Sequence, residues 1–347
     1  MKKIKWGIIG CGGIARRRTI PGLVKAGNAE LVAVMDTNEA FAKEVAAEFD
    51  AKYAFSDLDS LLALEEVDAV YIATPVFCHR EQVLAAANAG KHILLEKPMA
   101  LTSKEAEELM SLCESKGVRL SIGLMMRFHA YHEEMKRLIA EGAIGDIVSI
   151  RSQFACWYPD MPGVWRQDKA KSGGGALVDL GVHCIDLVQY VTGLRATEVT
   201  AFCETQTFSY GVDDSASVLL KMDNGALCVI ESNFNIPDDA VTGKIEIYGT
   251  AGSMRADGTL AQEEVGTVQV LRSDAGKAYD ANQTRQGNVS EYIDVPTGNM
   301  YTKEVERFGD AIQNGTEVPV PAQDAIYVQK IVEAAYTASA EKRFVTI

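Results

Sequence analysis

The hydrophobic pattern has two different forms along the chain. Up to about residue 122, short apolar runs alternate with stretches in which apolar residues recur at helical spacing. In the stretch 39–49, for example, Phe41, Val45 and Phe49 share one face of a predicted helix. Such alternation is typical of right-handed βαβ units, so we expect a parallel sheet covered by helices on both faces. The strands are expected at residues 5–9, 31–35, 69–73, 92–95 and 119–122.

Beyond residue 125 the pattern predicts half-exposed strands. Residues 147–154 alternate between apolar and polar, and two further runs flank the hairpin signal Asp223-Asn224-Gly225. A long helix is expected at 176–191, with two more helices near the C-terminus. The second half therefore reads as an α+β unit with a mostly antiparallel sheet. We predict two domains, residues 1–122 and 123–347, and a length of 347 residues suits that number.

Composition narrows the choice of partner. The chain has 34 Lys+Arg and 48 Asp+Glu, a formal net charge of −14. That charge disfavours nucleic acid and anionic membranes and favours small molecules as partners. Seven scattered cysteines without a C-x-x-C pair suit a reducing compartment, and no apolar stretch approaches the ~18 residues of a membrane span. We expect a cytoplasmic protein.

A glycine-rich loop follows the first predicted strand. Gly10-Cys11-Gly12-Gly13-Ile14-Ala15 matches G-x-G-x-x-A, in which the glycines permit a tight turn and close approach of a pyrophosphate. The following helix offers N–H groups and a positive dipole to the phosphates. Asp36 stands at the end of the second strand, where a carboxylate accepts hydrogen bonds from the adenosine ribose. Together these features predict a dinucleotide-binding domain.

The same acid favours NAD over NADP. A 2′-phosphate beside Asp36 would be repelled, and Thr37 and Asn38 supply no compensating cation. The run of arginines at 16–18 leaves NADP open, because basic side chains near the phosphate loop can hold a second phosphate. The alternative is that these arginines simply face solvent on the first helix.

Two further segments carry candidate chemistry. Glu96-Lys97-Pro98 ends a parallel strand, where Lys97 is placed to exchange a proton with a hydroxyl unless it is an ordinary surface lysine. After the glycines at 173–175, Asp179 and His183 are spaced four apart on a predicted helix, an arrangement suited to a general base. Asp186 continues the same helix face, so it could assist His183 together with Asp179 or in place of Asp179.

Metal binding is not expected. His129 and His132 are three residues apart at the start of a helix, but the sequence shows no third ligand. His79 follows Thr74-Pro75 and is a candidate to line the cofactor site, with an ordinary loop histidine as the alternative. The chain has no G-x-S-x-G motif and no phosphate-binding P-loop.

In their order and spacing these motifs resemble the Gfo/Idh/MocA family, the glucose-fructose oxidoreductase and inositol dehydrogenase group. The resemblance covers nearly the whole chain. Its landmarks are the loop at 10–15, residues 67–79, 89–98, Arg127-Phe128, 142–147, Trp165-Arg166, 173–183 and 249–253.

The resemblance implies a Rossmann domain followed by a domain with a large open sheet, and assembly into a homodimer or homotetramer. It also implies NAD- or NADP-dependent oxidation and reduction of a secondary hydroxyl on a sugar, glycoside or cyclic polyol. Lys97 and His183 would handle the proton, and Asp179 would bind a neighbouring hydroxyl. A cis peptide is expected at Lys97-Pro98.

The resemblance also suggests which residues contact each ligand. The cofactor contacts expected are Gly10, Gly12, Gly13, Ile14, Asp36, Thr37, Ala73, Thr74, Pro75, His79, Glu96, Lys97, Arg127, Trp165 and Arg166. The substrate contacts expected are Lys97, Arg127, Trp165, Asp179 and His183.

Two other functions stay open. One is redox-assisted cleavage of a glycoside by an enzyme that keeps NAD bound and recycles it. The other is a non-catalytic sensor, against which the intact Glu96-Lys97-Pro98 and Asp179…His183 motifs argue.

Overall fold

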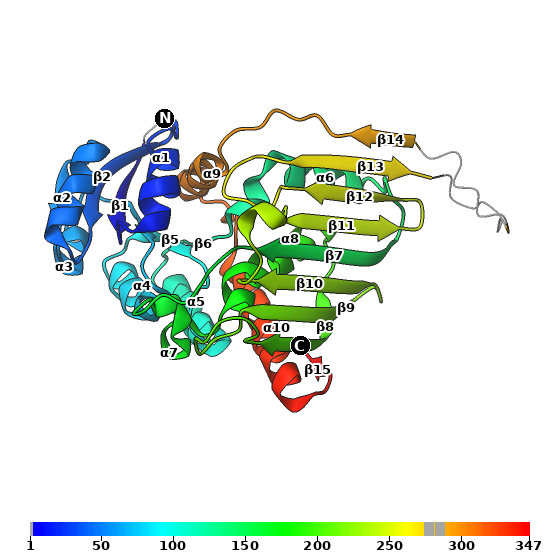
Figure 1. Ribbon diagram of the computed structural model, residues 1–347. Coiled ribbons are helices and arrows are strands. Elements are labelled where there is room, and N and C mark those ends of the chain that lie inside the picture. Colours follow the sequence, from blue (N-terminus) through cyan, green and yellow to red (C-terminus); the bar gives the residue numbers. More distant parts are fainter. Residues whose placement is uncertain (1–2, 274–280, 282–288) are drawn as a thin grey trace. The chain divides into compact units, whose positions relative to one another are not determined.

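The computed structural model describes residues 3–273, 281 and 289–347. By their internal contacts these residues form two compact units, which are described separately (Figure 1). The first comprises Met1–Met125, Ala170–Gly173 and Asn299–Gln329, and the second comprises Met126–Lys169, Gly174–Gly298 and Lys330–Ile347.

The described part of the first unit contains a six-stranded sheet in the order β3-β2-β1-β4-β5-β6, and every neighbouring pair is parallel. The strands are β1 (Ile4–Ile9), β2 (Ala29–Met35), β3 (Tyr53–Phe55), β4 (Ala69–Ile72), β5 (His92–Glu96) and β6 (Leu120–Gly123). This is the doubly wound order whose direction reverses at β1/β4, the place where such sheets bind dinucleotides. The predicted Rossmann domain is confirmed; the short β3 was not predicted.

Helices connect these strands. They are α1 (Ile20–Leu23), α2 (Glu39–Glu48), α3 (Leu58–Leu62), α4 (His79–Asn88) and α5 (Ser103–Ser115). Their starts follow local sequence signals: Asn38 caps α2 through the Phe41 N–H, and Thr102 caps α5 through the Glu105 N–H.

A late segment of the chain also belongs to the first unit. Helix α9 (Met300–Asn314) inserts Val305 and Phe308 into the core, where the rings of Phe308 and Trp6 lie 5.9 Å apart. The sequence predicts that all residues after 122 belong to the second domain, whereas residues 123–125, 170–173 and 299–329 belong to the first unit. The reason is packing, because the apolar face of α9 covers the region of β1 and α1.

The second unit contains, among its described residues, a nine-stranded sheet in the order β14-β13-β12-β11-β7-β10-β9-β8-β15. Only the β7–β10 pair is parallel among the neighbouring pairs described, so the predicted mostly antiparallel sheet is confirmed. The strands are β7 (Ile147–Ala155), β8 (Ala196–Glu204), β9 (Ser215–Met222), β10 (Leu227–Asn233), β11 (Lys244–Gly249), β12 (Gly252–Asp257), β13 (Thr267–Arg272), β14 (Val289–Tyr292) and β15 (Val345–Thr346).

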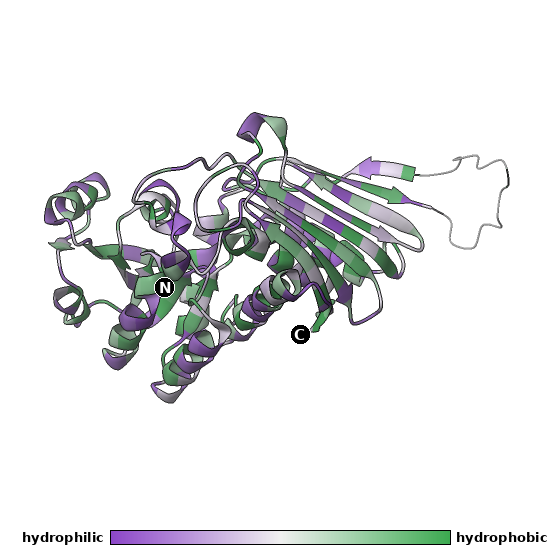
Figure 2. Cartoon of the chain, turned by 60° about the horizontal axis from the view of Figure 1, so that its bottom comes forward, coloured by the Kyte–Doolittle hydropathy of each residue, from purple (hydrophilic) through white to green (hydrophobic). Residues whose placement is uncertain are grey.

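The two faces of this sheet differ. Apolar and polar residues alternate along its strands (Figure 2), and α8 (Val182–Thr192) packs against β7 on one face. The opposite face exposes apolar side chains, including Phe202 on β8 and Leu227 on β10. The sheet is therefore open on that side, as predicted. The remaining helices are α6 (Ala130–Ala140), α7 (Lys169–Ser172), which lies mostly in the first unit, and α10 (Ala322–Glu341), whose two halves fall in different units.

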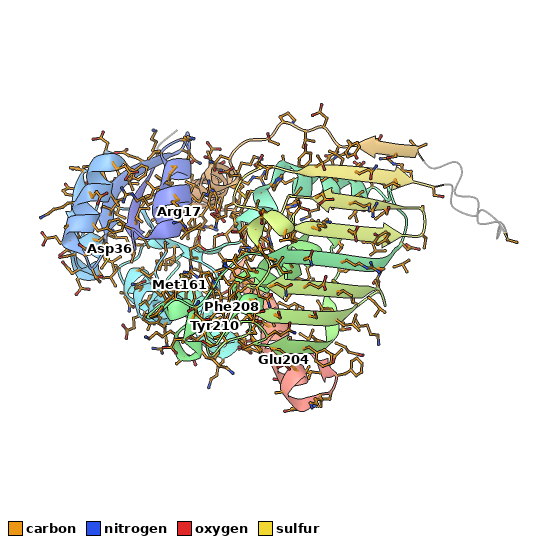
Figure 3. All side chains as sticks on the ribbon, in the orientation of Figure 1. Arg17, Asp36, Met161, Glu204, Phe208 and Tyr210 are labelled. Carbon is orange, nitrogen blue, oxygen red and sulfur yellow. The ribbon has the colours of Figure 1, made fainter. Side chains whose placement is uncertain are left out.

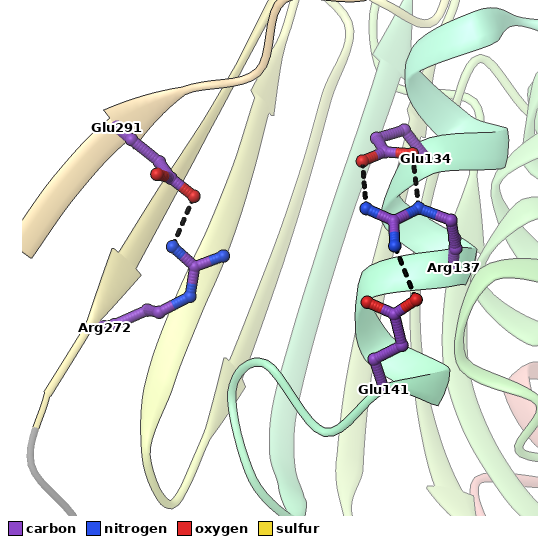
Figure 4. Close-up of polar contacts among 5 residues, drawn as sticks. All are labelled: Glu134, Arg137, Glu141, Arg272 and Glu291. Carbon is purple, nitrogen blue, oxygen red and sulfur yellow. Dashed lines mark hydrogen bonds and ion pairs between the residues drawn. The ribbon is translucent and has the colours of Figure 1, made fainter.

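The second unit carries ion pairs between exposed side chains (Figure 4). Arg137 on α6 pairs with Glu134 and Glu141, and Arg272 on β13 pairs with Glu291 on β14. Such exposed pairs contribute little stability individually. Among the described residues, no helix combines the length and apolar character needed to cross a bilayer.

Candidate active site

The glycine loop leaves β1 in a conformation that only its small residues allow. Gly10 has φ of +88°, and a Cβ there would lie 2.7 Å from Thr74 Cγ2. At Gly12, by contrast, a Cβ would meet nothing within 4 Å, so the backbone of this residue faces open space. The loop leads into a π-helical turn at Ala15–Thr19, a form often found at functional sites. This arrangement leaves room for a pyrophosphate to approach the backbone.

Asp36 is held in place at the carboxyl end of β2. Its Oδ2 accepts the Cys11 N–H at 3.1 Å, and its Oδ1 accepts the Asn38 N–H at 3.0 Å. Each carboxylate oxygen has two lone pairs, so both retain capacity for ribose hydroxyls. The glycine loop and Asp36 therefore fit the adenosine diphosphate part of a nicotinamide dinucleotide. Figure 3 labels Asp36, which directly follows β2, and Arg17, which lies in the π-helical turn after the glycine loop.

The three arginines after the loop have different surroundings. Arg16 pairs with Glu44 and Glu48 at 2.7 Å each and stacks over Phe41, so it is bound to α2. The Arg17 guanidinium lies over the glycine loop, because a Cβ at Gly13 would come within 2.9 Å of its Nη2. Of the two arginines Arg16 and Arg17, Arg17 is therefore the one placed to meet a phosphate.

His79 connects the ends of two strands. Its Nε2 lies 3.0 Å from the Thr74 carbonyl oxygen, beyond β4, and its Nδ1 lies 3.1 Å from the Pro98 carbonyl oxygen, beyond β5. Burial lowers the pKa of His79 to about 4, so the ring is neutral and only one of its nitrogens donates at a time. His79 is thus a buried contact of the Lys97-Pro98 segment, and its predicted role at the cofactor site stays a prediction.

The Glu96 carboxylate is fixed at the end of β5. Its Oε1 accepts the Tyr71 hydroxyl at 2.5 Å, and its Oε2 accepts the Lys97 N–H at 3.2 Å. Tyr71 in turn accepts the Thr19 hydroxyl at 2.9 Å. The Lys97-Pro98 bond is cis, as predicted, and Lys97 is half-buried.

The sequence did not identify a second acid in this region. Glu304 on α9 is 1% exposed, and burial together with the nearby charge of Glu96 raises its pKa well above the usual range. Burial and the same two glutamates also raise the pKa of the buried Tyr301. The one sequence signal for Glu304 is its position on the apolar face of α9, four residues before Phe308.

In the second unit, buried Asp213 fixes the start of the segment that carries the other candidates. Its carboxylate accepts the Gly175 and Leu177 N–H groups at 2.8 and 2.9 Å and the Tyr336 hydroxyl at 2.6 Å. A Cβ at Gly175 would lie 1.9 Å from the Asp213 carbonyl oxygen. Glycine at 175 is therefore required by close packing. No local sequence signal identifies Asp213.

Asp179 and His183 follow on a segment that is not a uniform α-helix. Asp179 lies in a second π-helical turn, Leu177–Gly181, and His183 lies in α8. The wider π turn changes the spacing that the sequence prediction assumed for a regular helix. Asp179 is half-exposed with its Oδ1 3.8 Å from Arg166 Nε, while His183 is 5% exposed beside the Phe154 ring.

The structure also groups Trp165 with Asp179. The Arg166 guanidinium carbon lies 4.4 Å from the centre of the Trp165 ring, so this arginine connects the indole with the carboxylate. Arg127 is separate from this group: it is 6% exposed, and its Nε lies 2.9 Å from Asp186 Oδ2 in a two-pronged ion pair. Asp186 is thus engaged by Arg127, which favours Asp179 over Asp186 for chemistry near His183.

The two histidines on and before α6 are held by other groups. His129 Nε2 lies 3.1 Å from the Val265 carbonyl oxygen, and His132 Nε2 lies 2.9 Å from Thr259 Oγ1. Burial lowers the pKa of His132 to about 3. Within the described ranges, no three His, Cys, Asp or Glu side chains are grouped to hold a metal.

Comparison with known proteins extends these observations. Residues 4–124 match the model of an oxidoreductase family with an NAD-binding Rossmann fold, GFO_IDH_MocA, and residues 132–255 match the GFO/IDH/MocA C-terminal domain. The chain is 30% identical to the 1,5-anhydro-D-fructose reductase of Ensifer adhaerens, over 93% of this chain and 92% of that protein. It is 31% identical to the D-xylose 1-dehydrogenase (NADP(+)) 2 of Haloferax volcanii, over 95% of this chain and 96% of that protein.

A solved structure is similar over the full length. It is levoglucosan dehydrogenase in complex with NADH and levoglucosan, with a TM-score of 0.87, 26% identity and 100% coverage of both chains. The similarity in fold therefore covers both units.

Proposed function

Because the chain belongs to the Gfo/Idh/MocA family of NAD(P)-binding sugar and polyol oxidoreductases, we propose that it oxidises or reduces a secondary hydroxyl of a sugar, glycoside or cyclic polyol. The observation that carries this proposal is the similarity to two sugar-converting enzymes over more than nine-tenths of the chain. When bound, the nicotinamide supplies the hydride acceptor or donor. The protein supplies binding, orientation and proton transfer.

We assign the cofactor to the carboxyl ends of β1, β2, β4 and β5. Gly10, Gly12, Gly13 and Ile14 would receive the pyrophosphate, and Asp36 with Thr37 would hold the adenosine ribose. The remaining contacts are assigned to Ala73, Thr74, Pro75, Glu96 and Lys97. His79 would hold Lys97 in position through its contact with the Pro98 carbonyl oxygen. The preferred cofactor is NAD, because the fixed Asp36 carboxylate would repel a 2′-phosphate. Arg16, one of the arginines after the loop, is already paired with two glutamates.

We assign the proton to Lys97 and His183. During oxidation this pair takes the hydroxyl proton, and during reduction it returns the proton. Asp179 would bind a neighbouring hydroxyl, because its carboxylate is half-exposed and is oriented by Arg166. Trp165 would pack beside the sugar or polyol ring of the substrate. Arg127 keeps its ion pair with Asp186 and would act by supporting the fold around α8.

Assembly and location are proposed on other grounds. The open face of the second sheet exposes Phe202 and Leu227, which would be covered in a homodimer or homotetramer. The seven cysteines are all free, which suits a cytoplasmic location.

The test is turnover with a panel of hexoses, pentoses, inositols and glycosides. Protein is mixed with NAD or NADP, and reduced nicotinamide is followed by its absorbance, together with the reverse reaction on the corresponding ketones. Lys97→Ala should abolish turnover and lower NAD affinity much less, since Lys97 is one of many assigned cofactor contacts, while the exposed-site control Lys104→Ala should behave as the wild type. Absence of turnover throughout the panel in both directions, or full activity of Lys97→Ala, contradicts the proposal.

A further inference from the structure

A group of aromatic side chains extends from His183 within the second unit, joined partly by ring contacts and partly by packing against one buried apolar cluster. The Phe154 ring meets the His183 ring at a centroid distance of 6.2 Å. Phe154, Tyr158 and Tyr210 all pack against a buried cluster that contains Phe234, whose ring lies 4.9 Å from that of Tyr158. From Tyr210 the group continues to Phe208 at 5.4 Å and from Phe208 to Trp157 at 5.2 Å. We call these rings the aromatic strip: Phe154, Phe234, Tyr158, Tyr210, Phe208 and Trp157.

The outer end of the strip faces solvent. Trp157 is 45% exposed, and Phe208 is partly exposed on the loop between β8 and β9, where Figure 3 labels Phe208 and Tyr210. A single exposed aromatic residue needs no explanation. A group of six that begins at a candidate catalytic histidine and ends in solvent is different, because its outer rings, Phe208 and Trp157, contact each other and not the histidine.

The loops that carry the outer rings are held by hydrogen bonds. Fully buried Asp214 accepts three consecutive backbone N–H groups, those of Gln206, Thr207 and Phe208, at 2.7 to 3.0 Å. Asp160 accepts both the N–H and the hydroxyl of Ser209. The position of Phe208 is therefore fixed by a buried carboxylate.

The loop that carries Trp157 is fixed in the same way. The Trp157 N–H donates to Asp238, and the next residue, Tyr158, bonds through its N–H to the Phe234 carbonyl. The Tyr210 hydroxyl donates to the Tyr158 carbonyl and so joins the two loops. Ordering exposed loops costs conformational entropy. The hydrogen bonds described above offset part of that cost and hold the Trp157 and Phe208 side chains in place.

The strip is also attached to the segment that carries Asp179 and His183. Asp213 binds the Gly175 and Leu177 N–H groups, while its neighbour Asp214 binds the Phe208 loop. Two adjacent buried aspartates thus hold the candidate catalytic segment and the aromatic loop in one rigid arrangement.

We propose that Phe208 and Trp157 form a binding subsite for the part of a glycoside that is not oxidised, a second ring attached through the glycosidic oxygen. This inference rests on the proposed function. The chemistry recognised is a flat ring with an apolar face, which stacks on aromatic side chains whether it is a sugar or an aryl aglycone. The substrate class is therefore narrowed from free sugars and polyols to glycosides that carry a ring substituent.

The experiment compares matched pairs of glycosides. Methyl and phenyl glycosides of glucose, galactose, mannose and xylose, in both anomers, and the disaccharide cellobiose are tested for kcat/KM with NAD. Their affinities for the protein saturated with NADH are measured by calorimetry. One stacked aromatic pair contributes up to ~1.5 kcal/mol, so the phenyl member of at least one pair should be preferred about tenfold. Cellobiose shows whether a sugar ring is accepted at the same subsite.

The variants separate this inference from the proposed function. Trp157→Ala and Phe208→Ala should remove the preference for the phenyl member by raising its KM, with kcat and all values for the methyl member unchanged. Phe344→Ala, at a more exposed aromatic residue elsewhere in the unit, should keep the preference. Equal values for methyl and phenyl members in every pair, or a preference that survives both substitutions, overturns the subsite.

If turnover is absent for every compound, the proposed function fails, and the calorimetric ratio still decides the subsite. Tighter binding of the phenyl glycoside that is lost in Trp157→Ala supports the subsite. Equal or undetectable binding of the methyl and phenyl glycosides overturns the subsite.

Discussion

The imidazole Nδ1 of His79 lies 3.1 Å from the carbonyl oxygen of Pro98, and this contact ties α4 to the segment that carries Lys97. The ring is 1% exposed, and burial lowers its pKa to about 4. The unfolded chain takes up a proton on this histidine below about pH 6.5, whereas the folded protein does so only near pH 4. His79 therefore makes stability fall as the pH drops through this window.

Replacing His79 should flatten that dependence. The 2.5-unit difference corresponds to about 3 kcal/mol lost between pH 6.5 and pH 4. The measurement is the free energy of unfolding in urea at several pH values for the wild type and His79→Asn. The variant should be less stable at pH 7 but lose less stability on acidification. A slope equal to that of the wild type would show that the ring is already charged in the folded protein.

The Asp36 carboxylate should determine cofactor choice. Asp36→Ala removes the acceptor for ribose hydroxyls and the repulsion of a 2′-phosphate. A hydrogen bond to a charged group contributes about 1.5–3 kcal/mol, so NAD affinity should fall roughly ten- to hundredfold while NADP affinity holds or improves. Fluorescence titration with NADH and NADPH measures both. The control is Asn38→Ala, which removes only the side-chain cap of α2. Equal losses of affinity for NADH and NADPH in Asp36→Ala would contradict the assignment of Asp36 to the ribose.

Glu304 should make the folded protein less stable as the pH rises. Burial keeps its carboxyl protonated, with its pKa raised, while in the unfolded chain it ionises near pH 4.5. Folding above that pH requires uptake of a proton, which costs up to about 1.4 kcal/mol per pH unit until the folded pKa is reached. Glu304→Gln mimics the neutral acid, so its stability relative to the wild type should grow between pH 5 and 8. The exposed Glu317→Gln provides the comparison, and parallel pH curves for Glu304→Gln and the wild type would mean that Glu304 is ionised.

Local signals account for the parts of this molecule that the sequence revealed. Buried parallel strands read as continuous apolar runs, and the loop at 10–15 and Asp36 follow their strands directly. The position of α9 was not predicted because an apolar helix face does not specify its partner, which is set by long-range packing such as that of Phe308 on Trp6. Glu304 was missed for the same reason.

The second unit shows a further limit of prediction from the sequence. The prediction placed Asp179 and His183 on one face of a regular helix, but residues 177–181 form a π turn. An α and a π turn differ by one residue in hydrogen-bond spacing, which the apolar pattern does not distinguish. Asp213, which fixes that turn, is 38 residues away from Gly175 and becomes visible only in the folded chain.

The Arg127–Asp186 pair should be important for stability and not for hydride transfer. Both side chains are at least nine-tenths buried, so removal of one partner leaves an uncompensated buried charge. Asp186→Ala should cost about 3–5 kcal/mol of unfolding free energy, and the double variant Arg127→Met/Asp186→Leu should recover most of it. Urea denaturation measures this. A fall in kcat of the stable double variant by more than tenfold would give Arg127 a direct role in the reaction.

Gly175→Ala tests whether the candidate catalytic segment depends on its contact with Asp213. The new Cβ would lie 1.9 Å from the Asp213 carbonyl oxygen, so the backbone must move and the bonds from Asp213 to the Gly175 and Leu177 N–H groups must distort. Such overpacking typically costs 1–3 kcal/mol of stability. Because Asp179 and His183 follow directly, kcat should fall by more than tenfold while NADH affinity, determined in the first unit, is retained. Gly211→Ala is the matched control two residues before Asp213, since a Cβ there meets nothing within 4 Å. If both variants keep wild-type kcat, the position of this segment is not critical for the reaction.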